Sequence, residues 1–228
     1  MYAQRGCVDK GSELEALRSL TPMIMTTLLY AEIYDAVTEL FTDILNHFPT
    51  FLTTNDFRAL SIFLTTEDAQ IIVARLRTGE FDTDDMSFAR LLLAYGDAAV
   101  QDLATKTHDP RMGQLLFQLL DLLKCDGYDD VEVDVYSGAF EFWTTYIEFA
   151  IDSRFDEGQE KGDAIWMDVA RQRIEAVIEV IWERIQAPPP EIAISWVSRN
   201  AELFPMESHD IVWEYTFCCQ PCPTHHLG

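Results

Sequence analysis

The sequence predicts an all-α protein in which antiparallel helix pairs follow one another as an α-solenoid. Apolar residues recur at helical spacing along almost the whole chain, and no stretch alternates convincingly like a β-strand. The 228 residues include only 10 Gly and 9 Pro, too few for a turn-rich all-β protein. Short connections between the helices favour stacked pairs, although the pattern alone also permits a globular helical bundle.

The first helices are indicated by apolar stripes and by residues suited to helix ends. Residues 31–48 form an amphipathic helix, because an apolar face opposes an acidic one. Its apolar stripe comprises Ile33, Val37, Leu40, Ile44 and Phe48. A second helix begins near Asn55. A third follows Thr65, whose spacing to Asp68 predicts a capping box, and it stops at Gly79.

The middle of the chain predicts two further helices. After an acidic turn over residues 80–85, a long helix capped by Thr83 or Asp84 continues at helical spacing to Leu103. Asp109-Pro110 starts the next helix, because Asp accepts bonds from free N–H groups and Pro suits the first helical position. That helix ends at Asp126-Gly127.

An acidic loop over residues 128–134 precedes a helix rich in aromatic side chains. We interpret these side chains as core rather than as a ligand pocket, since they recur at helical spacing. They are Phe140, Phe142, Trp143, Tyr146 and Phe149. Residues 152–163 predict a flexible connection, and a helix over 174–185 ends before Pro188. Short helices are predicted over 191–199 and 206–216.

The charge balance excludes some partners and favours others. There are 39 acidic residues against 16 basic ones, a net charge of -23. Such a field repels phosphate backbones and anionic lipid, so we expect no direct nucleic-acid binding and no membrane insertion. Basic proteins are favoured partners, although a role in solubility alone also explains the charge. The five cysteines form no disulfide framework, and no signal-peptide core is found, which indicates a soluble intracellular protein.

No catalytic motif is present, so we predict that the chain is not an enzyme and needs no cofactor. Phosphate-binding glycine loops, the G-x-S-x-G elbow and H-E-x-x-H are all missing. The tail holds Cys218, Cys219, Cys222, His225 and His226, but these ligands are crowded into one short segment, so we predict no metal site. The acidic loop Asp126–Asp134 lacks the Gly and the terminal Glu of an EF-hand.

Several segments resemble the middle repeats of the importin-beta superfamily of nuclear transport receptors, the karyopherins. They are Leu122–Tyr128 (LLKCDGY), Phe140–Trp143 (FEFW), Tyr146–Glu148 (YIE), Ala31–Leu45 and Phe88–Asp97. The resemblance is to the branch containing importin-thirteen and transportin-SR, in its fungal form, and it covers roughly residues 20–190. It implies HEAT repeats of the armadillo-type fold, basic protein cargo, binding of Ran-GTP, and a place in both cytoplasm and nucleus.

The resemblance also implies a fragment, since family receptors are several times longer than this chain. We divide the chain into an atypical segment 1–19, a HEAT-repeat solenoid 20–199, and a segment 200–228 that carries the Cys/His tail. The candidate partner-binding residues are acidic, because a basic partner needs carboxylates. They are Asp129, Asp130, Glu132 and Asp134 in the loop, and Glu175, Glu179 and Glu183 on the last long helix.

Two other functions stay open on the sequence alone. One is a non-transport HEAT-repeat scaffold or adaptor within a larger assembly, whose partners are insensitive to Ran-GTP. The other is a small helical enzyme or a zinc-dependent module built on the Cys/His tail. The direction of transport and the identity of the cargo are not encoded in any motif we find.

Overall fold

The computed structural model describes residues 10–125, 130–155 and 164–186, and nearly all of them are helical. No strand occurs in this described part of the chain, which confirms the predicted all-α class. Two compact units can be separated, Met1–Ile174 and Glu175–Gly228, and α10 (Ala164–Gln186) crosses the boundary between them. The predicted short helices over 191–199 and 206–216 and the Cys/His tail lie outside the described residues.

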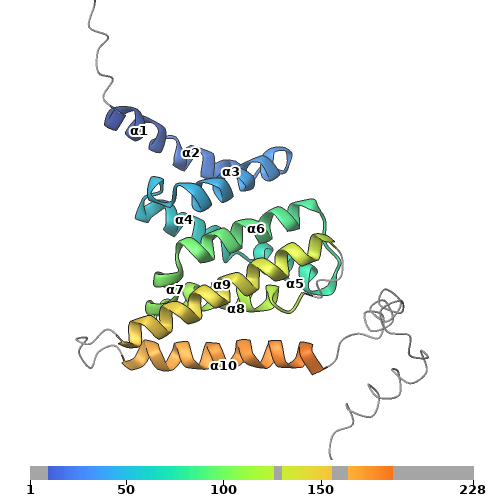
Figure 1. Ribbon diagram of the computed structural model, residues 1–228. Coiled ribbons are helices and arrows are strands. Elements are labelled where there is room, and N and C mark those ends of the chain that lie inside the picture. Colours follow the sequence, from blue (N-terminus) through green and yellow to red (C-terminus); the bar gives the residue numbers. More distant parts are fainter. Residues whose placement is uncertain (1–9, 126–129, 156–163, 187–228) are drawn as a thin grey trace, which may run out of the picture. The chain divides into compact units, whose positions relative to one another are not determined.

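Nine α-helices and two short 3-10 helices precede α10 in the described ranges, all of them in the first unit (Figure 1). They are α1 (Lys10–Arg18), α2 (Thr21–Thr27), η1 (Ala31–Ile33), α3 (Tyr34–His47), η2 (Pro49–Phe51), α4 (Thr54–Leu64), α5 (Glu67–Thr78), α6 (Thr83–Ala98), α7 (Val100–Thr105), α8 (Pro110–Leu122) and α9 (Asp130–Phe155).

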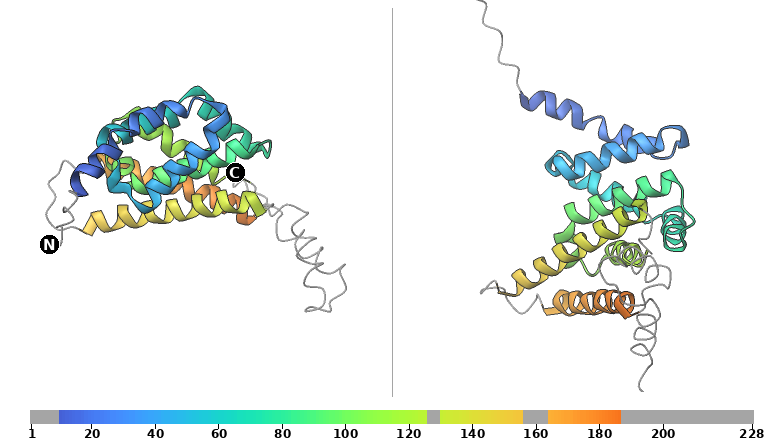
Figure 2. Two further views of the ribbon diagram at one scale, coloured as in Figure 1. Left: turned by 90° about the horizontal axis from the view of Figure 1, so that it is seen from above. Right: turned by 45° about the vertical axis from the view of Figure 1, so that its right-hand side comes forward.

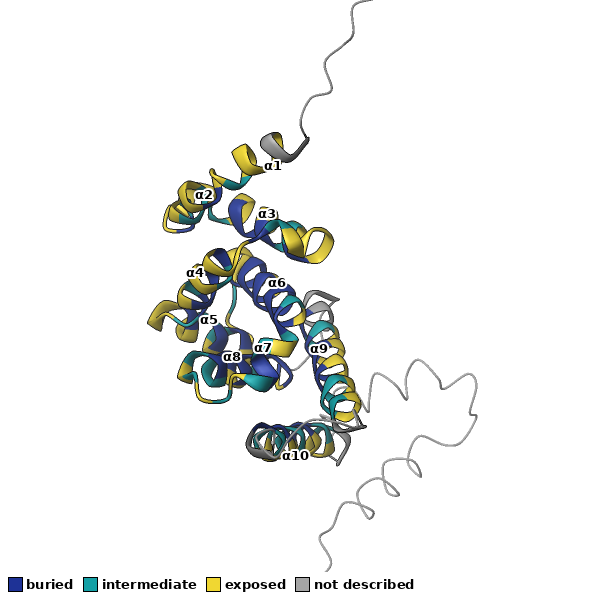
Figure 3. Cartoon of the chain, turned by 90° about the vertical axis from the view of Figure 1, so that its left-hand side faces the viewer, coloured by how far each residue is buried: buried dark blue, intermediate teal, exposed yellow. Residues whose placement is uncertain are grey.

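The helices of the first unit form two layers of successive pairs. One layer holds α3, α6 and α9, with α3 lying along α6 and α6 along α9. The other holds α2, α4, α5 and α8, and Figure 3 shows the buried faces where the two layers meet. In the right-hand view of Figure 2, α5 and α8 are seen nearly end-on while α6 and α9 run across the view. This stacking of helix pairs confirms the predicted solenoid.

The centre of the core is α6, which is buried from Asp85 to Gly96 except at Arg90. Two glycines let α9 approach it closely. A Cβ on Gly96 would lie 3.0 Å from the Phe142 ring, and one on Gly138 would lie 2.8 Å from Leu93 Cδ1. The buried Trp143 donates its indole N–H to the carbonyl oxygen of Leu119 at 3.3 Å, which ties α9 to α8.

Several predicted helix ends are confirmed. Helix α4 begins at Thr54, next to the predicted start near Asn55, and Thr53 and Asp56 form a capping box there that was not predicted. Asp109 accepts the N–H of Arg111 at 2.9 Å, and Pro110 occupies the first position of α8. Gly79 ends α5 in the left-handed conformation, with φ of 73°.

Other predicted ends are wrong by one residue or more. The cap of α5 is Thr66, whose hydroxyl accepts the N–H of Ala69, while Thr65 belongs to the end of α4. The cap of α6 is Asp82, because its carboxylate reaches the N–H of Asp85 in a capping box. The predicted long helix to Leu103 is two helices, since the chain turns at Ala99 with φ of -112° and ψ of 14°.

The predicted acidic loop over residues 128–134 is also wrong, because α9 already begins at Asp130. In α3, the buried face is centred on Val37, Phe41 and Leu45. Ile33, Leu40 and Phe48 of the predicted stripe are exposed. The aromatic cluster of α9 is core as predicted at Phe142, Trp143 and Tyr146, but Phe140 is exposed and Phe149 is partly buried.

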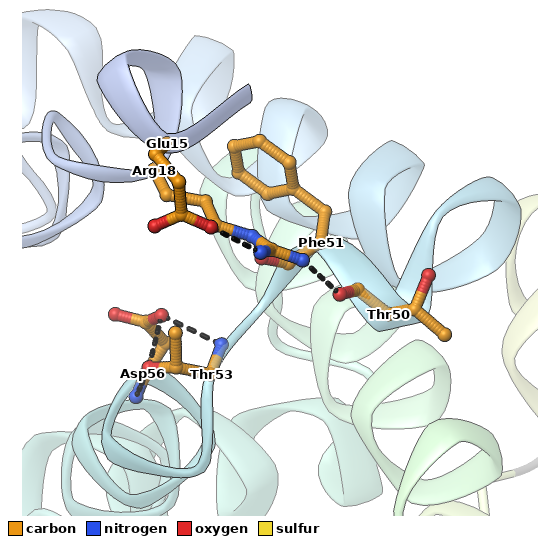
Figure 4. Close-up of polar contacts among 6 residues, drawn as sticks. All are labelled: Glu15, Arg18, Thr50, Phe51, Thr53 and Asp56. Carbon is orange, nitrogen blue, oxygen red and sulfur yellow. Dashed lines mark hydrogen bonds and ion pairs between the residues drawn. The ribbon is translucent and has the colours of Figure 1, made fainter. Parts of the chain in front are cut away.

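A single arginine anchors α1 to η2, the short 3-10 helix that follows α3 (Figure 4). The Arg18 guanidinium donates to the carbonyl oxygens of Phe51 at 2.8 Å and Thr50 at 2.7 Å, and it pairs with Glu15. It also lies 6.0 Å from the centre of the Phe51 ring. Arginine suits this place because its planar donors can satisfy several unpaired carbonyl groups at a helix end.

Candidate functional site

Charge is distributed unequally between the two layers of the first unit. Helices α4, α5 and α8 together contain as many arginines as acidic residues, whereas α3, α6 and α9 are strongly acidic. The acidic residues of α3, α6 and α9 are Asp35, Glu39, Asp43, Asp84, Asp85, Asp97, Asp130, Glu132, Asp134, Glu141, Glu148 and Asp152. Their only arginines are Arg90 and Arg154, they contain no lysine, and His47 ends α3. A one-sided layer of this kind suits a cationic partner.

Five carboxylates of α3 and α9 are exposed, make no ion pair and accept no side-chain hydrogen bond from any residue whose side chain the structure describes, unlike Asp35, which accepts one from Ser87. They are Glu39, Asp43, Glu141, Glu148 and Asp152. The other layer differs, because Arg77 of α5 lies 3.7 Å from Asp121 of α8. We call these five residues the acidic surface. Its uncompensated charge makes it a candidate for binding a basic partner.

Asp97 shows how strongly the negative charges act on one another. It lies at the end of α6, and partial burial raises the pKa of its carboxyl to about 6, with a second contribution from the charge of Glu141 on α9. Its side chain still reaches solvent, so screening reduces the energetic effect. A nearby cation from a partner would favour the ionised form of Asp97.

A buried ion pair fixes the turn between α5 and α6. The Asp85 side chain is fully buried, at 0% exposure, and pairs with the half-exposed Arg75. Burial raises the pKa of Asp85 although Arg75 and the N–H of Asp82 lower it. Burial, followed by the charges of Asp84, Asp85 and Asp82, likewise raises the pKa of the Tyr34 phenol. The Asp85 carboxylate helps to hold α5 and α6 together and is too enclosed to meet a partner.

The residues predicted from sequence fall in two places. Asp129 lies outside the described residues, and Asp130, Glu132 and Asp134 belong to the start of α9. Glu175, Glu179 and Glu183 are exposed along one face of α10, in the second unit. Each set lies within its own unit.

Sequence reasoning missed the acidic surface as a candidate site. Its signal was present, because Asp35, Glu39 and Asp43 recur four residues apart opposite the apolar face. Glu141 and Asp97 could not be paired from sequence, since their proximity depends on the packing of α9 on α6. Among the described residues, no group of three His, Cys, Asp or Glu side chains could hold a metal ion, and no helix is long and apolar enough to cross a membrane.

Comparison with known proteins gives one informative similarity. No family model matches the chain, and no solved structure matches it. The chain is similar to the importin beta-like protein kap111 of Schizosaccharomyces pombe, with 24% identity over 215 residues. This similarity supports the importin-beta superfamily. The alignment covers 92% of the chain but only 21% of the relative, so the chain spans about a fifth of that protein's length. It does not distinguish among the branches of the superfamily.

Proposed function

We propose that the chain is part of a nuclear transport receptor that binds basic protein cargo through its acidic helices. The observation that carries this proposal is the segregation of acidic residues into α3, α6 and α9. The similarity to an importin beta-like protein supports the transport role at the level of the superfamily. Binding cargo requires no catalytic group, which agrees with a receptor rather than an enzyme.

The partner-binding residues comprise the acidic surface and, as predicted from sequence, Glu175, Glu179 and Glu183 of α10. The acidic residues from Asp129 to Asp134 belong to the same proposal. Complementary charge accelerates the encounter with a basic partner and makes binding sensitive to salt. Movement between cytoplasm and nucleus, and release or loading by Ran-GTP, are proposed for the whole protein of which this chain resembles a fifth.

Within the superfamily, we propose the importin-thirteen and transportin-SR branch. The support is the segment Leu122–Tyr128, followed by the Phe142–Trp143 pair of α9, which is buried in the core. A tree built from many receptor sequences tests this placement. Grouping with a different branch would overturn it and leave the transport role untouched.

The binding role is tested by removing charge from the acidic surface and from the opposite layer in equal amounts. We compare Glu141→Gln/Glu148→Gln with the control Glu67→Gln/Asp68→Asn, which also loses two exposed carboxylates but on α5. The probe is a fluorescein-labelled lysine-rich peptide, followed by anisotropy. We expect the α9 variant to bind about three- to tenfold more weakly and the control to change less than about twofold. Equal losses in both variants would mean that only net charge matters.

The transport role needs a separate measurement. Ran loaded with GTP or with GDP is added to the longest available form of the protein carrying a bound basic partner. A change in partner binding with the GTP form alone is expected for a receptor. If neither form affects the partner while the acidic surface still binds it, the scaffold function replaces transport.

A further inference from the structure

Arg173, near the start of α10, lies on an aromatic ring and not beside a carboxylate. Its guanidinium is 4.2 Å from the centre of the Phe117 ring of α8, and both residues belong to the first unit. The chain contains 39 acidic residues, yet Arg173 makes no ion pair with any residue whose side chain the structure describes. No carboxylate within that part of the chain therefore neutralises this cation.

The stacked position leaves the hydrogen-bond donors of the guanidinium available. A guanidinium that lies on a ring uses its flat face, whereas its N–H groups point outward in its plane. Arg173 is only partly buried, and Phe117 is 56% exposed, so the pair lies at the surface of the first unit.

The surface of α8 beside the guanidinium has room for a small ligand. Gly113 lies one helical turn before Phe117, and a Cβ there would have only one heavy atom within 4 Å outside the local helix. That atom is Nη2 of Arg173, at 3.9 Å. The space that a side chain would fill at Gly113 therefore adjoins the N–H groups of Arg173.

A buried hydroxyl from α9 lies within electrostatic reach of the same guanidinium. Tyr146 is 0% exposed, and its hydroxyl has no hydrogen-bond partner in the described part of the chain. Burial raises the pKa of Tyr146 to about 12, and the charge of Arg173 acts against this rise. Because an unpaired buried hydroxyl is unfavourable, an acceptor that reached it would be stabilised.

The chemistry of these groups selects a carboxylate as the ligand. A guanidinium binds both oxygens of a carboxylate through two parallel charge-assisted hydrogen bonds. A carboxylate oxygen has a further lone pair that can accept the hydroxyl of Tyr146. A cation would be repelled by Arg173, and an apolar ligand would leave both donors unpaired. The net charge of -23 opposes an anion, so we expect a dissociation constant on the order of 1 mM.

We propose that Arg173, Gly113 and Tyr146 form a carboxylate-binding site where α8, α9 and the start of α10 meet. The guanidinium holds the two oxygens over the glycine, and a shift of the flexible Arg173 side chain opens the Tyr146 hydroxyl to one of them. This site does not depend on the proposed function, which concerns basic partners, because it accepts a group of the opposite charge.

The test follows the backbone amide signals of Gly113 and Phe117 in the full chain by NMR at pH 7. Sodium acetate replaces sodium chloride at constant ionic strength, and we expect saturable shifts in the wild type. Arg173→Gln should abolish them. Arg173→Lys keeps the charge without the planar fork and should bind about fivefold more weakly or less well still. The control is Arg171→Gln, which loses the same charge two residues away and should change the affinity less than about twofold. Arg171 is 70% exposed and lies 3.7 Å from Asp168.

Two further variants test the other parts of the site. Tyr146→Phe removes only the hydroxyl and should weaken acetate binding about threefold, and Gly113→Ala should weaken it by filling the space beside Arg173. Circular dichroism melting identifies any variant that does not fold as the wild type does. A blocked Gly-Glu-Gly peptide is the second probe. Tighter binding of the peptide than of acetate assigns the site to a protein side chain, and the reverse order assigns it to small carboxylates.

The outcomes that overturn the site are distinct from those that overturn the proposed function. Linear, unsaturable shifts in the wild type, or equal losses in Arg171→Gln and Arg173→Gln, would show that acetate acts only on the general charge of the chain. Unchanged affinity in folded Arg173→Gln or Tyr146→Phe also overturns the site. Binding of the lysine-rich peptide to the acidic surface is unaffected by any of these results.

Discussion

At the scale of single residues, Asp97 is held where its negative charge is disfavoured. It sits in the last turn of α6, where the helix dipole is also negative, and near Glu141 of α9. Its pKa of about 6 in the folded protein exceeds its ordinary value of 3.8. The protonated form therefore stabilises the folded state. That contribution is complete below the unfolded value and is lost as the pH rises through about 6.

We expect Asp97→Asn to stabilise the chain at pH 8 and to have little effect near pH 4. Asparagine resembles the protonated acid, so it removes a penalty present only when Asp97 is ionised. The rise in Tm at pH 8 should be about 2–4 °C, the effect of roughly 1 kcal/mol in a protein of this size after allowance for solvent screening. Thermal melts from pH 4 to 8 measure it. Glu39→Gln is the control, and a pH-independent gain for Asp97→Asn would contradict the explanation.

The buried Asp85 carboxylate depends on its ion pair with Arg75 to offset its negative charge. Removing the guanidinium in Arg75→Met leaves a fully buried carboxylate without its cation, and we expect a loss of about 3 kcal/mol, near the lower end for broken buried pairs because Arg75 is partly exposed. Urea unfolding measures this loss. It should shrink at acid pH, because Asp85 is then neutral, and Asp85→Asn added to Arg75→Met should recover part of it. A loss that is constant with pH would exclude this charge as the cause.

At the scale of helices, the contact between α6 and α9 depends on glycine. We expect Gly96→Ala to destabilise the chain by about 1–3 kcal/mol, although alanine is the better helix former, because the new methyl group meets the buried Phe142 ring. Chemical denaturation gives the value. Gly113→Ala is the matched control, since the nearest atom to its new Cβ is an Arg173 nitrogen at 3.9 Å, and it should be neutral or stabilising. Equal effects at the two positions would show that this close contact does not govern stability.

Helix identity was predictable from the sequence, but several helix ends were not. Thr65 and Thr66 are both good caps, and only the geometry selects Thr66, which leaves Thr65 at the end of α4. Asp82 prevails over Thr83 because it shares a capping box with Asp85. The break between α6 and α7 falls at Ala99, and no glycine or proline at that position signals it in the sequence. Leu103 and Ala104 both become fully buried beyond the turn, so tertiary packing overrides local preference there.

The buried faces were less predictable than the helices themselves. In α3, apolar residues cover more than one face, and the sequence does not say which face meets α6. The structure chooses Val37, Phe41 and Leu45, which leaves Leu40 and Phe48 exposed. The same uncertainty applies to α10, where Trp182 is apolar at helical spacing but lies on the exposed side. Binding surfaces are hidden from sequence for this reason, since they use the residues that cores use.

At the scale of the whole molecule, charge repulsion and exposed apolar side chains have opposite effects on self-association of the chain. Between α1 and the C-cap of α3, many large apolar side chains are exposed, namely Leu14, Leu17, Leu20, Met23, Leu29, Tyr30, Ile33, Leu40 and Phe48. Apolar surface of this kind favours association, whereas a net charge of -23 resists it. The salt concentration determines which effect dominates, because the screening length for charge repulsion falls from about 10 Å at 0.1 M to about 3 Å at 1 M.

We expect the chain to be monomeric at low salt and to associate reversibly near 1 M sodium chloride. Sedimentation velocity measures the change. Leu17→Lys/Met23→Lys should keep the chain monomeric, and Ile71→Lys, which alters an equally exposed apolar residue on α5, should not. Association that persists in the first variant would place the responsible surface elsewhere.

The unequal charge of the two layers gives the first unit a permanent electric dipole. In the field of a positively charged partner, this dipole experiences a torque before the two proteins touch. The torque turns the side that carries α3, α6 and α9 toward the partner. The relative orientation of the two proteins is thus biased before contact, over distances of about one screening length. Short-range contacts then need only to accept or reject a partner that has already arrived facing the correct way.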